Sequence, residues 1–171
     1  SIQEVLRFLN GDYDIILKEL EEKMYKASEA LEFEKAIEYR ELLTSVQKIA
    51  QKQKITDTDG NDRDILAVAT DADDAVVQVF FIRGGRLIGR DHFYLTGIHG
   101  ETKSAILSSF VKQFYAGTPY IPAQLMLPET IEDLELIEEW LSKTRGHKVH
   151  VLVPKKGTKE KLVELGKKLA E

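Results

Sequence analysis

The sequence predicts an α+β protein in which an N-terminal helical hairpin is followed by a domain built on a mixed β-sheet. Residues 1–54 contain no proline, and their apolar residues recur at spacings of three and four, which is typical of helices. After residue 64 the apolar residues gather in short runs rich in Val, Ile and Phe, which is typical of strands. Helical patterns then alternate with further short strands, and this order favours a mixed sheet with helices on both faces.

The composition excludes several classes of protein. Charged residues make up 31% and hydrophobic residues 43% of the chain, and no apolar run approaches the roughly 18 residues that span a bilayer. The absence of cysteine excludes disulfides and a thiol nucleophile. A net charge of −5 argues against a protein that coats DNA over its whole surface. We expect a cytoplasmic protein, and the start at Ser1 without a methionine suggests a segment of a longer chain.

The helical region, residues 1–54, carries signals for its own boundaries. Ser1 and Glu4 fit a capping box, and Gly11 fits the C-terminal end of a first helix. Asp12 or Asp14 then caps the next helix.

Two apolar stripes follow in this region, separated by a shift of phase. The first stripe consists of Leu17, Leu20, Met24, Ala27 and Leu31. The second consists of Phe33, Ala36, Ile37, Leu43, Val46, Ile49 and Ala50, with Arg40 in an apolar position. The shift predicts two antiparallel helices joined by a tight turn. Such a hairpin is too small to stand alone, so it buries its apolar face against the rest of the chain or against a partner.

A polar connection, residues 51–64, separates the hairpin from the second region, residues 55–171. The predicted elements of this region are strands at 65–69, 75–83 and 86–95, a helix at 102–116, a strand at 123–127, a helix capped by Thr130, a strand at 148–153, and a last helix capped by Thr158. Gly84 and Gly85 fit a two-residue hairpin turn. The order βββαβαβα is the one found in ribonuclease H-like folds.

The hairpin resembles a known motif at residues 20–41, where Leu20, Met24 and Ala27 precede the run LEFEKAIEYRE at residues 31–41. This run is similar to the UVR motif shared by UvrB and UvrC, which usually has two alanines at positions 36–37 and often an aspartate at position 41. Residues 77–93 (VQVFFIRGGRLIGRDHF), 109–115 (SFVKQFY) and 153–157 (VPKKG) resemble the UvrC segment that follows its UVR motif. The family usually has Arg in place of Lys156.

The resemblance implies a non-catalytic adaptor in the UvrABC nucleotide excision repair endonuclease. The UvrC family places one cut in a GIY-YIG domain and the other in a later ribonuclease H-like domain. Residues 1–171 contain neither a GIY or YIG triplet nor the Asp-Asp-His set of the second nuclease within its family motifs. We therefore expect residues 55–171 to form an inactive ribonuclease H-like domain, and the hairpin to bind UvrB.

Phe33 is the residue that we expect to anchor the partner, because it lies at the hairpin turn. The predicted partner-binding residues are Leu20, Met24, Leu31, Phe33, Glu34, Ile37, Arg40 and Leu43. Phe33 could instead hold only its own two helices together. Two copies of the chain could also pair through their hairpins.

Two other functions remain open from the sequence. A metal-dependent nuclease would use acidic residues near the strand ends, namely Asp71, Asp73, Asp74, Glu101 and Glu129. A DNA-binding module would use basic residues in two clusters, namely Arg83, Arg86 and Arg90, and Lys155, Lys156, Lys159 and Lys161. The four histidines lack ligand spacing, so we expect no metal and no cofactor.

Overall fold

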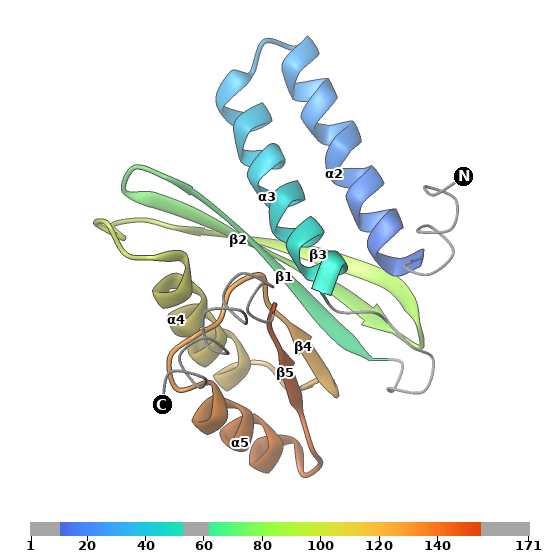
Figure 1. The fold of residues 1–171 in the computed structure, drawn as a ribbon, viewed down its shortest axis with the longest axis vertical. Helices are drawn as coiled ribbons and strands as arrows, with labels where there is room; N and C mark the ends of the chain where they lie inside the picture. The colour runs from blue at the N-terminus through green and yellow to red at the C-terminus, as the bar shows by residue number, and fades with distance from the viewer. Residues whose placement is uncertain (1–10, 53–61, 155–171) are drawn as a thin grey trace, which may run out of the picture.

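The computed structural model describes residues 11–52 and 62–154 (Figure 1). Its elements are α2 (Gly11–Glu29), α3 (Phe33–Lys52), β1 (Arg63–Asp71), β2 (Asp74–Arg83), β3 (Arg86–Leu95), α4 (Lys103–Ala116), β4 (Gln124–Met126), α5 (Leu134–Arg145) and β5 (His150–Leu152). The predicted α+β class is confirmed, and the predicted order is confirmed through β5. In these ranges no helix is long and apolar enough to cross a membrane.

The five strands form one mixed sheet in the order β3-β2-β1-β4-β5. β1, β2 and β3 are an antiparallel meander, because short turns connect them. β4 runs parallel to β1, and β5 runs parallel to β4, because a helix precedes each of these strands and returns the chain to the same end of the sheet.

Helices cover both faces of the sheet, and each face has its own hydrophobic core (Figure 1). Side chains alternate along β1, so Leu66 and Val68 face α4 and α5. Ile65 and Ala67 face the α2–α3 hairpin on the other side. All four side chains are fully buried, which explains why β1 reads as a continuous apolar run.

The hairpin shares its core with the sheet. Leu20 of α2 and Val46 and Ile49 of α3 are fully buried in the cluster that contains Ile65 and Phe80. Lys48 also forms an ion pair of 3.0 Å with Glu129, which follows β4. The sequence left open whether the hairpin packs its apolar face against the rest of the chain or against another protein. In the half of the hairpin nearest the sheet, it is the rest of the chain that covers this face.

α3 also completes the hydrogen bonding of β1. β4 pairs with β1 only from Arg63 to Ile65, so the β4-facing edge of β1 lacks a strand beyond that point. The Ser45 hydroxyl donates to the Val68 carbonyl at 2.9 Å and accepts from the Val68 N–H at 3.1 Å. One turn earlier, the Glu41 carboxylate accepts from the Thr70 N–H at 2.9 Å. Two side chains of α3 thus take the place of a neighbouring strand.

Turn and capping residues in the sequence correctly predict the boundary between β2 and β3 and the start of α4. Gly84 and Gly85 have φ values of 57° and 75°, as a two-residue turn between antiparallel strands requires. Thr102 caps α4, and its hydroxyl accepts from the Ala105 N–H at 3.1 Å.

Other capping predictions were wrong. Positions 12 and 14 lie inside α2, which begins at Gly11, so neither aspartate stands before the helix as its cap. The helix that Gly11 was expected to end falls on residues 1–10. α5 begins at Leu134, four residues after Thr130, because residues 130–133 turn to bury Ile131 in the core. Residues 1–10, with the proposed capping box, and residues 155–171, with the proposed last helix, lie outside the described residues.

Replacing Ser45 with alanine should lower the free energy of unfolding by about 1–3 kcal/mol, because the Val68 N–H and carbonyl lose a buried partner. Thr44→Ala is the matched control, since the Thr44 hydroxyl donates to the Arg40 carbonyl of its own helix at the surface. Urea denaturation of both variants measures the difference. Equal stability of the two would contradict the role given to Ser45.

Candidate partner-binding site

The apolar residues of the hairpin divide into a buried half and an exposed tip. Near the sheet, Leu20, Val46 and Ile49 are fully buried, although Ile15 on the outer side of α2 is 55% exposed. At the turn the exposed fractions are 72% for Leu31, 59% for Phe33 and 49% for Ile37, with Tyr25 at 57%. We call these four residues the hairpin tip. In Figure 1 the turn of the hairpin extends away from the sheet, so the tip is open to solvent.

The backbone at the turn places Leu31 in a strained conformation. The Glu32 N–H donates to the Ala27 carbonyl at 2.8 Å, and the Leu31 N–H donates to the Ser28 carbonyl at 3.0 Å. This is a Schellman motif with Leu31 at the position that favours glycine, at φ 63°. A branched side chain held there at the surface costs free energy, and such strain gathers at functional sites.

The predicted partner-binding residues differ in how exposed they are to solvent. Leu20 is fully buried in the core of the chain itself, so it is not available to a partner in this conformation. Met24 and Leu43 are half-buried. Glu34 and Arg40 are exposed, and neither forms an ion pair within the described ranges. The remaining predicted residues, Leu31, Phe33 and Ile37, belong to the hairpin tip.

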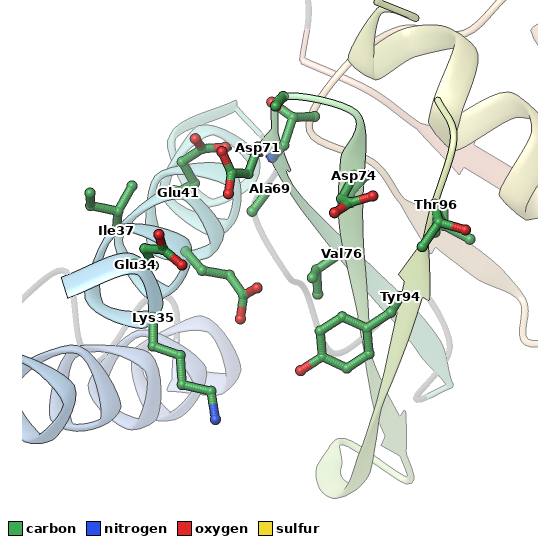
Figure 2. A pocket seen from close by; sticks show the side chains of 15 residues that line it. Glu34, Lys35, Ile37, Glu41, Ala69, Asp71, Asp74, Val76, Tyr94 and Thr96 are labelled. Carbon is green, nitrogen blue, oxygen red and sulfur yellow. Dashed lines mark hydrogen bonds between the residues drawn. The ribbon is translucent and has the colours of Figure 1, made fainter. Parts of the chain in front are cut away.

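A cleft of about 550 Å³ opens beside the tip, where α3 diverges from the sheet (Figure 2). Its lining comes from the first half of α3, the β1–β2 turn and the end of β3, with Glu34, Lys35, Ile37, Glu38, Glu41, Ala69, Thr70, Asp71, Ala72, Asp74, Ala75, Val76, Tyr94, Leu95 and Thr96. We call it the acidic cleft, after its five carboxylates. Burial raises the pKa of Glu38; Lys35 opposes this increase, and Asp71 and Glu41 add to it.

The first predicted basic cluster, Arg83, Arg86 and Arg90, does not form one surface. Arg83 points inward, where it forms a 2.9 Å ion pair with Asp64 and lies 4.7 Å from the ring centroid of Tyr120. Arg90 forms a 2.7 Å ion pair with Glu19 of α2. Arg86 is exposed. The basic residues Lys155, Lys156, Lys159 and Lys161 lie outside the described residues.

Sequence reasoning missed a buried polar cluster around Asp64, which is 1% exposed. Its carboxylate accepts from the Tyr115 hydroxyl at 2.6 Å and from Arg83 at 2.9 Å. Burial nevertheless raises the pKa of Asp64, and burial together with the Asp64 charge raises that of Tyr115 well above 10. A carboxylate just before an apolar run was the only sequence signal, and it did not indicate a partner 51 residues away.

The candidate nuclease acids are dispersed. Asp71 and Asp74 are cross-strand partners at the β1–β2 turn, and Asp73 lies 3.7 Å from His99. Glu101 is exposed in a loop, and Glu129 is paired with Lys48. Within residues 11–52 and 62–154, no three side chains of His, Asp or Glu are grouped so as to hold a metal ion.

Tyr115→Phe should lower the free energy of unfolding by about 1–3 kcal/mol at pH 7, because the ionised Asp64 carboxylate loses a buried donor. The tyrosine hydroxyl favours the ionised form, so the variant raises the pKa of Asp64 further. The loss should therefore shrink as the pH falls through that pKa and Asp64 becomes protonated. Tyr25→Phe is the control, since Tyr25 is 57% exposed on α2 and lies far from Asp64 in the fold. Urea denaturation at neutral and acid pH tests this; a loss that does not depend on pH would contradict it.

Comparison with known proteins agrees with this arrangement. Residues 62–171 match the family model of the UvrC ribonuclease H-like domain, and residues 14–49 match that of the UvrB/uvrC motif. The chain is 54% identical over 170 residues to UvrABC system protein C of Lachnospira eligens, which covers 99% of this chain and 28% of that protein. The corresponding protein of Acetivibrio thermocellus is 46% identical over 169 residues, with 99% and 27% covered.

UvrABC system protein C of Clostridioides difficile is 44% identical over 170 residues, which are 99% of this chain and 28% of that protein. The chain thus spans a little over a quarter of the length of these relatives. The two family matches coincide with the two parts of the structure, the α2–α3 hairpin and the sheet domain. The chain belongs to the UvrC family, with a UVR motif in its hairpin and the UvrC ribonuclease H-like domain in its second part.

Proposed function

We propose that this chain is a non-catalytic adaptor in UvrABC nucleotide excision repair, which docks on UvrB and positions the flanking nuclease domains for incision of damaged DNA. The observation that carries the proposal is the hairpin tip. Four large apolar side chains are about half exposed or more there, whereas Leu20, Val46 and Ile49 nearer the sheet are fully buried. Exposed apolar groups gathered in one place are typical of an interface with another protein.

The chemistry of the tip fits a helical partner. Leu31, Phe33 and Ile37 lie at the turn and along the first turns of α3, so they present one apolar surface at the end of the hairpin. Aromatic side chains such as Phe33 are enriched among the residues that dominate binding energy. A second UVR hairpin offers a matching apolar surface, and UvrB/uvrC is the motif that residues 14–49 match.

The packing of the hairpin supports a positioning role. Its base shares a core with the sheet, and the Arg90–Glu19 and Lys48–Glu129 ion pairs join it to β3 and to the segment after β4. A partner held at the tip is therefore held in a defined orientation to the whole domain.

The absence of catalysis in this chain is part of the proposal. It is supported by what the acidic side chains do instead. Asp64 is committed to Tyr115 and Arg83, and Glu129 to Lys48. Asp71 ends β1 and Asp74 begins β2, and both line the acidic cleft.

Phe33→Ala should weaken binding to UvrB by about 30-fold or more, because a central aromatic anchor commonly contributes about 2 kcal/mol or more. Leu136→Ala is the matched control, since Leu136 is an equally exposed apolar residue on α5. Isothermal titration calorimetry measures both affinities, and circular dichroism checks that each variant is folded. Equal affinities of Phe33→Ala and Leu136→Ala would refute docking through the tip.

The chain should not cut DNA with magnesium or manganese, and Asp71→Asn should change nothing. Gel assays with damaged and undamaged duplexes at high protein concentration test this. Metal-dependent cutting that Asp71→Asn abolishes would replace the adaptor proposal with a nuclease.

Contacts with DNA and pairing of two copies are secondary proposals. Among the described basic residues of the first cluster, Arg86 is exposed and forms no ion pair, so it is the candidate DNA contact. Arg86→Ala should then reduce the salt dependence of DNA binding by the assembled complex. Self-pairing through the tip should appear in sedimentation of the free chain and should disappear when UvrB is added.

A further inference from the structure

The acidic cleft lies next to the hairpin tip. A partner that binds the tip alone would not contact the cleft. Its floor includes the short side chains of Ala69 and Val76, which are cross-strand partners near the joined ends of β1 and β2. Because these side chains are short, α3 and the sheet enclose a space of about 550 Å³. A groove of this size holds a few side chains of a bound segment.

The rim of the cleft carries an excess of negative charge. Glu34, Glu38, Asp71 and Asp74 form no ion pair in the part of the chain that the structure describes, and Lys35 is the cationic residue of the lining. Carboxylates held close together around an apolar floor repel one another. A cation placed among them would offset that repulsion, whereas a phosphate backbone would add to it.

The wall opposite α3 adds an aromatic ring. Tyr94 is 66% exposed, and Figure 2 shows its ring extending from β3 toward α3, with Val76 between the ring and Asp74. The face of a tyrosine ring attracts the ammonium or guanidinium group of a basic side chain. Carboxylates, an aromatic face and an apolar floor together match a basic side chain flanked by apolar ones.

We propose that the acidic cleft binds a segment of the same protein partner that docks on the hairpin tip, and that this segment presents Lys or Arg beside apolar residues. This inference rests on the proposed function. Ile37 joins the two surfaces, because it belongs to the tip and also lines the cleft. A single partner can therefore contact both, with apolar contacts at the tip and charge complementarity in the cleft.

The test compares two variants of equal net charge. Glu38→Gln with Asp74→Asn removes two charges from the cleft, and Glu132→Gln with Glu135→Gln removes two exposed charges at the start of α5. Binding of full-length UvrB is measured by calorimetry at low and high salt. The cleft variant should bind about fivefold to tenfold more weakly at low salt, with a smaller salt dependence, and the α5 variant should bind like the wild type.

A second probe separates this inference from the proposed function. It is a synthetic helical peptide of leucine and lysine, titrated into the same variants. Weaker peptide binding by the cleft variant than by the α5 variant supports the cleft, even if UvrB fails to bind. If the cleft variant and the α5 variant bind UvrB equally and also bind the peptide equally, the cleft inference is overturned. If Phe33→Ala still loses UvrB binding in that case, docking through the tip stands.

Discussion

The contact between α3 and β1 is the constraint on which the rest of the structure depends. β4 is short, so a central strand of the sheet has an open edge beyond Ile65. Ser45 and Glu41 bond to the backbone at that edge, and the core formed by Leu42, Val46 and Ile49 covers the face beside it. Since a buried N–H or carbonyl without a partner costs more than one hydrogen bond yields, the sheet is complete only when the hairpin is in place.

This constraint explains why the hairpin has two unlike ends. Its base is fixed by the sheet, so its tip projects beyond the sheet and cannot fold back to cover its apolar residues. The same divergence opens the acidic cleft between α3 and the ends of β1 and β2 (Figure 2). Leu31 keeps a branched side chain in a left-handed conformation where glycine would be less strained, which suits a residue retained for binding.

The sequence predicted elements better than their contacts. The start of the strand at residues 86–95 was predicted correctly because the Gly84–Gly85 turn marks it. The hairpin turn was found because the apolar phase shifts there. Periodicity locates an apolar stripe but not what covers it, so Leu20 was assigned to a partner although the sheet buries it. The Asp64 cluster and the acidic cleft join segments far apart in the chain, and no local pattern marks them.

The most direct test of the account is hydrogen exchange of the Val68 and Thr70 amides with and without UvrB. Both amides donate to side chains of α3, so they report whether the hairpin stays on the sheet. The account predicts that both remain protected when UvrB binds, while new protection appears at the hairpin turn. Loss of protection at Val68 and Thr70 on binding would contradict it, because the hairpin would then leave the sheet in order to dock.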